Sequence, residues 1–482
     1  MRSTFSGLYT GYRGLAAQQR ALDVTGHNVA NANTQGYTRQ DVIMQAAQAM
    51  KTVDGYVGTG VNIAELRRVK DQFIDIQMRT ENKALGEWEV KADILSKLEV
   101  IFNEPSETSL RSVLDQFWES WQTLSKNPEG VAARTTVMQR GVSLTNTFNH
   151  LAAQFFDLQV DINKSIETKV SEINSIAYQL RDINAQIIKA EAAGHKANDL
   201  RDRRELLLEG LAKLVNIDVV EDELGAVNVT IGGRFLVART NVSLMRFVDN
   251  TADPMKAKIE WYDAYSHVSQ GDVNINGGEI KGYLDMRDQV ITNYHGKLSE
   301  LAQRIAEEVN ALHQVGYGLD GTTGLDFFVM DDAGPDFTAK NIRVNQAIID
   351  NLNLIAAAGE KNPDPLADPP VFQGDGSNAL LLAQLKNKLT MSVGTASFDD
   401  FYRSTLSQLG IEGQEASQMV DNRNSLIEQL VNRRAAVSGV SLDEEMTNMI
   451  RFQHAYSASA RVINIMDEML DLIVNRLGLI GR

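Results

Sequence analysis

A seven-residue apolar repeat at each end of the chain constrains the fold most strongly. The N-terminal repeat comprises Leu8, Leu15, Leu22 and Val29, and the C-terminal repeat comprises Leu442, Met449, Tyr456, Ile463, Leu470 and Leu477. Such a repeat places one apolar stripe along a helix, and that stripe must be buried against another helix. Because chain ends normally fray, we expect the terminal helices to pair with each other and with neighbouring copies, with these residues at the subunit interface.

The N-terminal helix is predicted over residues 3–33 and is intrinsically weak. Ser3 or Thr4 can cap it, and glycines interrupt it at positions 7, 11, 14 and 26. Each glycine costs roughly 0.5–1 kcal/mol relative to alanine. A lone helix with this composition is marginal in water, so we expect it to become ordered only in an assembly.

Between the ends, the pattern predicts a mainly α fold with small β excursions. Helices are expected at about 69–102, 109–126, 131–192, 197–215, 283–312 and 397–482, with a turn near Ser438-Gly439. The period changes to two in an excursion at about 216–280, with strands at 227–231, 235–237, 258–261 and 273–275. Residues 34–65 are expected to be irregular or β, and residues 316–395 to be turn-rich.

If the ends pair, the domains are nested, and the middle of the sequence lies farthest from the termini. We expect residues 1–65 and 440–482 to form a terminal coiled coil. Residues 66–325 and 396–439 would form a long-helix bundle that contains the β excursion. Residues 326–395 would form a small outer part or an irregular insertion.

Local signals give finer expectations for the helices. Pro105 ends one helix, and Ser106 or Thr108 can start the next. Gly141 is the weak point of the longest helix. Asn184 continues an apolar line of that helix, which favours either a register-setting seam position or a solvent-facing one.

Composition excludes several classes of protein. The net charge is −16, which argues against binding to nucleic acid or to anionic lipid. The chain has no cysteine, so disulfides and thiolate chemistry are excluded. No apolar run is long enough to insert into a membrane, and the N-terminus lacks the apolar core of a cleavable signal peptide. An exported chain of this kind would need another route.

No constellation of residues predicts catalysis, a metal site or a cofactor. The histidines at 27, 150, 195, 267, 295, 313 and 454 are too far apart for a helical zinc motif. Two acidic pairs, Glu444-Glu445 and Asp467-Glu468, are expected on solvated helix faces. The tryptophans are expected in the core rather than on a ligand platform. The Asp320–Asp331 segment departs from a calcium-loop pattern and is interpreted as a turn.

Two segments resemble the signatures of flagellar axial proteins. Asn28-Val-Ala-Asn-Ala-Asn-Thr-Gln-Gly-Tyr37 is similar to the signature shared by rod, hook and hook-associated proteins. Asp443–Gln453 and the following Ala455–Arg461 are similar to the signature at the other end of that group. The motif residues are Asn28, Ala30, Asn31, Thr34, Gly36 and Tyr37, and Phe452, Gln453, Tyr456, Ala460 and Arg461.

Motifs in the middle of the chain resemble the hook-associated protein 1 family. They are Phe117-Trp118-x-x-Trp121, Asn127-Pro128-Glu129, Arg134, Asn198–Arg203 and Gly374-Asp-x-x-Asn378-Ala-Leu380. The likeness covers nearly the whole chain. Residues 325–395 look short for the family, so the resemblance implies a small, reduced outer domain at 326–395.

The resemblance implies a non-enzymatic subunit of the bacterial flagellum. It would leave the cell through the flagellar type III export channel and form a ring of identical subunits at the hook–filament junction. The terminal coiled coil, residues 1–65 and 440–482, would form the inner tube of that ring. The partners of the subunit would be hook protein, a second, filament-side hook-associated protein, and a cytoplasmic export chaperone. The chaperone would hold the C-terminal helix at Met449, Ile463, Met466 and Leu470. The protein would be cytoplasmic before export and extracellular afterwards.

Three alternatives stay open at the level of sequence. Another axial protein, such as hook or distal rod protein, would be richer in β-structure through the middle than residues 131–215 indicate. An enzyme within a flagellar scaffold has no supporting motif. An adhesin-like coiled-coil stalk does not account for the two axial signatures.

Overall fold

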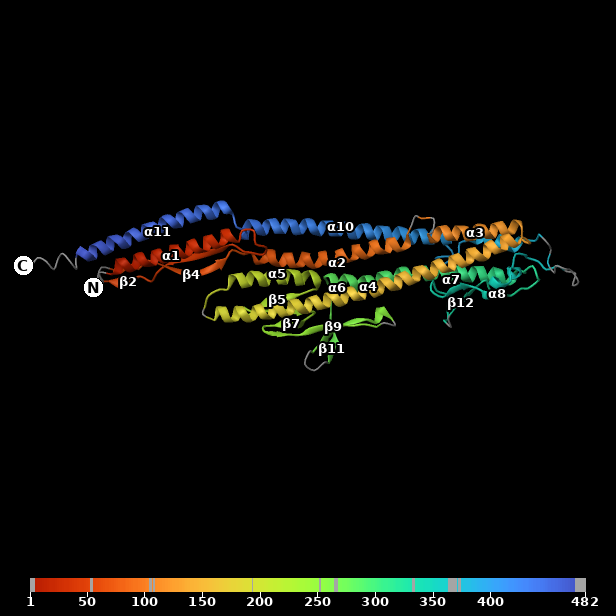
Figure 1. The fold of residues 1–482 in the computed structure, drawn as a ribbon, viewed down its shortest axis with the longest axis horizontal. Helices are drawn as coiled ribbons and strands as arrows, with labels where there is room; N and C mark the ends of the chain where they lie inside the picture. Colours follow the sequence, from red (N-terminus) through yellow and green to blue (C-terminus); the bar gives the residue numbers. More distant parts are fainter. Residues whose placement is uncertain are drawn as a thin grey trace, which may run out of the picture.

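Long helices aligned with one axis give the molecule its elongated shape (Figure 1). The computed structural model describes residues 5–52, 55–103, 106, 109–192, 194–250, 253–263, 268–331, 334–362, 371 and 374–472. Helices α1 (Ser6–Ala30) and α11 (Leu442–Asp471) lie side by side at one end. The predicted fold class is confirmed, including the pairing of the two chain ends.

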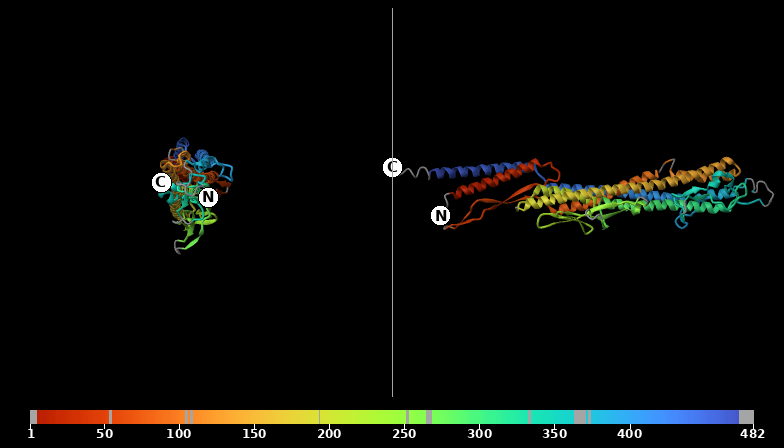
Figure 2. Two further views of the ribbon diagram at one scale, coloured as in Figure 1. Left: turned by 90° about the vertical axis from the view of Figure 1, so that its right-hand side faces the viewer. Right: turned by 60° about the horizontal axis from the view of Figure 1, so that its bottom comes forward.

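A long β-hairpin accompanies the paired terminal helices. Strands β1 (Gln40–Ala46) and β4 (Val61–Arg68) are antiparallel, and β2 (Met50–Thr52) pairs with β3 (Gly55–Val57) farther along the hairpin. We call α1, the hairpin and α11 the terminal unit. Figure 2 shows it continuing the long axis beyond the rest of the molecule. The predicted caps Ser3 and Thr4 lie outside the described residues.

The rest of the molecule, here called the body, is built on long helices. They are α2 (Gln72–Phe102), α3 (Leu110–Lys126), α4 (Val131–Glu191), α5 (Asn198–Leu214), α6 (Glu279–Asp285), α7 (Ile291–Val315) and α10 (Phe398–Ser438). A π-helical turn, Met286–Val290, joins α6 to α7 without a break. Ser109 caps α3 by accepting from the Ser112 N–H, so the prediction of Ser106 is wrong, and Thr108 lies outside the described residues.

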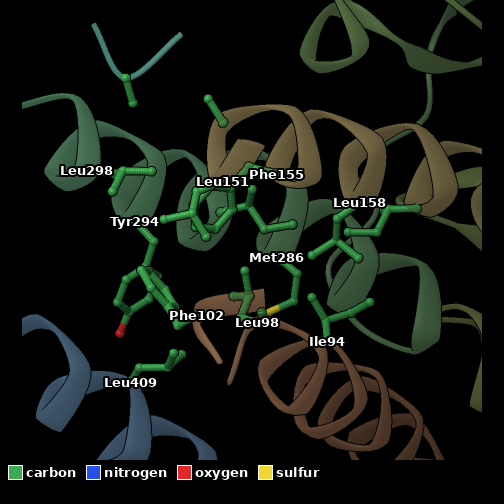
Figure 3. Close-up of a cluster of buried hydrophobic side chains, with 14 of the residues drawn as sticks. Ile94, Leu98, Phe102, Leu151, Phe155, Leu158, Met286, Tyr294, Leu298 and Leu409 are labelled. Carbon is green, nitrogen blue, oxygen red and sulfur yellow. The ribbon is translucent and has the colours of Figure 1, made fainter. Parts of the chain in front are cut away.

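The body encloses a core of large apolar side chains. Phe102 lies at the centre of one cluster, with its ring 5.6 Å from that of Phe155 and 6.3 Å from that of Tyr294 (Figure 3). Trp118 and Trp121 are 3% and 0% exposed, which confirms their predicted core position. Full burial of a phenylalanine or leucine side chain contributes roughly 1.5–3 kcal/mol, so this core is a main source of the stability of the body.

Two small antiparallel sheets lie against α4. The first has the order β5 (Asp218–Glu221), β6 (Val227–Ile231), β7 (Arg234–Ala238), β8 (Asn241–Val242), and the second has the order β11 (Ser269–Asp272), β10 (Lys258–Tyr262), β9 (Leu244–Val248). The strand predicted at 273–275 is wrong. Asn216 bonds the N–H of Asn276 and the C=O of Gly277, and so draws this segment towards the end of α5.

Asparagines of α4 hold the sheets in place. Asn184 accepts from the Val227 N–H at 3.1 Å and donates to the Val227 C=O at 2.8 Å and the Arg239 C=O at 2.9 Å. Asn174 bonds the N–H and C=O of Met245 in the same way, at 3.0 and 2.7 Å. Asn184 is 0% exposed. Both earlier interpretations of Asn184 are therefore wrong, because its partner is strand backbone rather than a helix seam or solvent.

Gly141 is a packing position rather than the weak point predicted in α4. Helix α4 continues through it unbroken. A Cβ atom there would lie 2.9 Å from Phe327 and 3.2 Å from Val344. The absence of a side chain therefore lets the segment containing Phe327 approach the helix closely.

The end of the body farthest from the terminal unit contains the irregular region. It comprises β12 (Phe328–Met330), β13 (Ile342–Val344), α8 (Gln346–Asp350) and α9 (Ser377–Gln384). Buried Arg134 ties it to the helices, donating to the C=O groups of Pro128, Leu352 and Ile355. The Asp320 carboxylate accepts from the Thr322 N–H, which supports the predicted turn.

Candidate assembly interface

Helix α1 packs on α11 through glycines. A Cβ atom at Gly7 would lie 2.6 Å from Met466, one at Gly11 2.9 Å from Ile463, and one at Gly14 3.0 Å from Ser459. These glycines share one side of α1 at spacings of four and three residues. The features that weaken α1 as an isolated helix therefore allow its backbone to approach α11 closely.

The predicted α1 stripe is offset from this contact. Leu8, Leu15, Leu22 and Val29 are all partly buried, each one position after the line of Gly7, Gly14, Ala21 and Asn28. Ala21 and Asn28 are 0% and 1% exposed. The stripe therefore flanks the contact with α11 and keeps part of its apolar surface open.

The predicted α11 stripe is also partly covered within the single chain. Met449, Tyr456, Ile463 and Leu470 are partly buried, and Ile463 contacts α1 at Gly11. Leu442 is 52% exposed, and Leu477 lies outside the described residues. The structure thus brings Ile463 of the α11 stripe against the glycine line of α1 and leaves Leu442 in solvent.

The terminal unit carries further exposed apolar side chains. They are Tyr9 and Tyr12 on α1, and Met446, Ile450, Val462, Ile465, Met469 and Leu472 on α11. Each is between 42% and 60% exposed. Apolar surface spread along two paired helices in this way is typical of a surface that other protein chains cover.

The N-terminal signature forms a buried hydrogen-bonded hub. The Asn28 amide donates to the Gln40 C=O at 2.9 Å and to the Glu445 carboxylate at 3.2 Å. Its oxygen accepts from the Gln40 N–H at 3.0 Å and from the Tyr37 hydroxyl at 2.7 Å. Burial, with Asp199, Asp202 and Glu445 nearby, raises the pKa of Tyr37 well above its ordinary value, so it stays a neutral donor. The hub therefore fixes α1, β1 and α11 to one another.

Other residues of the N-terminal signature shape the turn after α1. Asn31 donates to the His27 C=O, and the Thr34 hydroxyl donates to Asn31. Gly36 has φ +78° and faces Leu206 of α5, a conformation that glycine adopts without strain. Ala30 is exposed.

Some residues of the C-terminal signature face α1, and others are exposed to solvent. Phe452 lines a cavity of about 220 Å³ together with Asn28 and Glu445. Ala460 is partly buried, whereas Gln453 and Arg461 are exposed. The signature therefore includes side chains that the single chain leaves available.

Glu445 is a residue of the terminal unit whose buried position the sequence interpretation missed. It is 3% exposed, so its assignment to a solvated helix face is wrong, whereas Glu444 is exposed and pairs with Arg39 at 2.6 Å. Asn28 supplies the hydrogen bond that satisfies the buried carboxylate. The contact joins residues 417 positions apart, which no local pattern reveals.

The described residues hold no cluster of histidine or acidic side chains arranged for a metal ion. Among the helices in the described part of the chain, none is long and apolar enough to cross a membrane. The features that gather at the terminal unit are packing surfaces and hydrogen bonds rather than reactive groups.

An elongated helical subunit with paired, partly uncovered ends and two axial signatures defines a structural protein of the bacterial flagellum. The model of the flagella basal body rod protein family matches residues 8–38, and that of the flagellar basal body rod FlgEFG protein C-terminal family matches residues 434–477. The model described as the flagellar hook-associated protein FlgK helical domain matches residues 95–328. A relative that is 33% identical over the whole of both chains shows that the chain belongs to the flagellar hook-associated protein 1 family.

Full-length relatives support this assignment. The flagellar hook-associated protein 1 of Bacillus subtilis (strain 168) is 33% identical, with all of both chains covered. The protein of that name from Salmonella typhimurium is 27% identical, covering 96% of this chain and 98% of the relative. The solved structure of the flagellar hook junction protein FlgK from Burkholderia pseudomallei matches with a TM-score of 0.65 at 16% identity, covering 75% of this chain and all of that one, and so shows the same fold.

Family membership resolves the main functional alternatives. The relatives are structural flagellar proteins rather than enzymes, and this chain is a structural component of the flagellum. The match over the whole chain places it with the hook-associated proteins rather than with hook or distal rod proteins.

Proposed function

We propose that this protein forms the junction between the flagellar hook and the filament as a ring of identical subunits. The observation that carries the proposal is the pairing of α1 with α11 at one end of the molecule, with apolar side chains left exposed along both helices. In the ring, the terminal units of adjacent copies would cover one another's exposed residues and form an inner tube. The bodies would lie outside it.

The predicted stripe residues have a defined role in this proposal. Leu8, Leu15, Leu22 and Val29 flank the contact with α11, so a neighbouring terminal unit can bury them from the open side. Leu442 and the exposed residues of α11 would contact a second neighbour. The nested domains would be the inner tube (1–65 and 440–482), the helical middle domain (66–325 and 396–439) and a small outer domain (326–395).

The partners follow from a position at the junction. One face of the ring would contact hook protein, and the other would contact a second, filament-side hook-associated protein. Before export through the type III channel, a cytoplasmic chaperone would bind α11. Met449, Ile463, Met466 and Leu470 lie on the side of α11 that α1 covers here, so a chaperone groove would take the place of α1. The assembled protein would be extracellular.

Electron microscopy of flagella from a strain lacking the protein tests the junction role. We expect hooks without filaments and flagellin released into the medium, and complementation by the full chain should restore filaments. Chains lacking residues 1–33 or 442–482 should fail to complement while the body still folds. Normal filaments in the deletion strain, or incorporation of both truncated chains, would contradict the proposal.

A matched pair of glycine variants tests the terminal unit more finely. Gly11→Leu places a large side chain where Ile463 already lies 2.9 Å from a Cβ atom, so α1 should no longer pair with α11 and filaments should be lost. Gly26→Ala serves as the control, because no atom lies within 4 Å of its Cβ position. Both variants should be exported to similar levels, measured in the medium, if the defect lies in assembly.

A further inference from the structure

Helix α5 carries polar groups with different partners on two of its sides. Asn198, Asp199, Asp202 and Glu205 lie on one side of its N-terminal half, at spacings of one, four and seven residues. Arg201 and Arg204 lie on another side and are 7% and 3% exposed. The side with Asn198, Asp199, Asp202 and Glu205 contacts the terminal unit and the segment that leads into α2. The side with Arg201 and Arg204 contacts the rest of the body.

The contacts with the terminal unit combine an ion pair with hydrogen bonds to backbone. Asp202 accepts from the Thr38 N–H at 2.9 Å and pairs with Arg68 of β4 at 2.8 Å. Gln40 of β1 donates to Asp199 at 2.7 Å. Asn198 donates to the Leu66 C=O at 3.1 Å and to Gln40 at 3.1 Å. Both strands of the hairpin are therefore held by one helix.

Glu205 holds the point where the hairpin leads into α2. It pairs with Lys70 at 2.8 Å, and the Arg79 guanidinium of α2 lies on its other oxygen. Burial alone would raise the pKa of Glu205, but Lys70, Arg79 and Arg68 outweigh it and hold the pKa below its ordinary value. The carboxylate therefore stays charged at neutral pH.

The arginines on the other side tie α5 to the body. Arg201 donates to Glu191 of α4 at 2.6 and 2.9 Å and to Glu221 of β5 at 2.7 Å. Arg204 donates to the Gly225 C=O at 2.6 Å and to Glu221 at 2.8 Å. Charge-assisted hydrogen bonds have strict geometry and are stronger than neutral ones, so α5 is held rigidly on this side.

We propose that α5 is the bracket that fixes the direction of the terminal unit relative to the body. Directional hydrogen bonds favour one angle between the terminal unit and the body, whereas a purely apolar contact would let the two parts slide over each other. The Arg68–Asp202 pair is 12% and 7% exposed, and partly buried pairs are only weakly screened by salt. The angle should therefore persist across ionic strengths. The inference concerns the single chain and does not depend on the position of the protein in the flagellum.

Distance measurements between two spin labels on the full-length chain test the bracket. The chain has no cysteine, so exposed Ala64 of β4 and exposed Ser171 of α4 can be replaced by cysteine and labelled without removing native thiols. The parent chain should give one narrow distance distribution at low and at high salt. Asp202→Ala should broaden it at least twofold, because Arg68 and the Thr38 N–H lose their acceptor. Arg203→Gln is the matched control, since Arg203 is on the same helix but exposed.

Tryptophan fluorescence separates loss of the bracket from loss of the fold. All tryptophans, at 88, 118, 121 and 261, lie in the body. If Asp202→Ala changes the tryptophan emission, the distance distribution of the Gln40→Ala variant becomes the deciding measurement. Gln40 is suited to this because it lies in the hairpin and bonds both Asp199 and Asn198. The proposal is overturned if Gln40→Ala leaves the distribution narrow, or if Arg203→Gln broadens it as much as the bracket variants do.

Discussion

The body and the terminal unit are both helical, but they bury different side chains. In the body, aromatic and branched residues such as Phe148, Phe155 and Trp121 are fully buried between several layers. In the terminal unit, glycines of α1 meet α11, and the larger apolar residues are only partly covered. The body has its own core, whereas the terminal unit leaves large apolar side chains exposed along both of its helices.

This difference indicates that the two regions depend on association to different degrees. Buried apolar area is the main favourable term in folding, and the paired terminal helices leave much of theirs in solvent. The order of the terminal unit should therefore depend on neighbouring copies, and that of the body should not.

A cavity in the body should be far more costly than one in the terminal unit. Phe155→Ala should lower the free energy of unfolding by about 3–5 kcal/mol, because Phe155 is 0% exposed and packs edge-on against Phe102. Ile463→Ala should lower the free energy of unfolding of the free chain by less than about 1.5 kcal/mol, yet it should impair the restoration of filaments in the deletion strain. Urea unfolding followed by tryptophan fluorescence measures the first effect. Equal losses of stability would refute the contrast.

As pH falls, the body should lose stability at pH values above the range in which most carboxylates titrate. His313 donates from Nδ1 to the Leu325 C=O and accepts the Ala356 N–H at Nε2, and burial lowers its pKa from 6.5 to about 4. The unfolded chain binds this proton at higher pH than the folded one, so stability is lost as pH falls from 6.5 to 4. The loss should be about 3 kcal/mol.

Replacing the histidine provides the control for this pH dependence. His313→Gln should be less stable at pH 7 but should show a smaller loss between pH 6.5 and 4. His150→Gln, at an exposed position, should retain the full dependence. Identical slopes for all three proteins would show that other groups cause the effect.

Loss of a single buried asparagine should loosen one sheet from α4. Asn184→Ala leaves the Val227 N–H and C=O and the Arg239 C=O without their partner. An unsatisfied buried polar group costs about 1–3 kcal/mol. Gln186→Ala, at an exposed position of the same helix, should change stability by less than about 0.5 kcal/mol. Faster hydrogen exchange confined to β6 and β7 would locate the effect.

The smallest expected effect is a gain in the terminal unit. Gly26→Ala should stabilise α1 by about 0.5–1 kcal/mol through helix propensity, because its Cβ position is open. Gly11→Ala should gain less or lose stability, because Ile463 must move. Amide exchange of α1 in the free chain measures both. A larger gain at Gly11 would contradict the close packing of the two helices.

The long helices and the pairing of the ends could be predicted because their periodicity is local. The side of α1 that packs on α11 could not be predicted from the sequence. A glycine that only weakens a helix cannot be distinguished there from a glycine that lets another helix pack closely. The burial of Glu445 and of Asn184 could not be predicted for a related reason. A polar residue is normally solvated, and its burial depends on a partner, Asn28 or Val227, that only the tertiary fold supplies.

The asparagine on α4 that bonds Met245 has a consequence for solubility. Strand β9 is an edge of its sheet, and its outward N–H and C=O groups at Met245 are the ones that another chain could pair with. Asn174 occupies both. Another chain therefore cannot pair with the backbone of Met245 by adding a strand to this sheet.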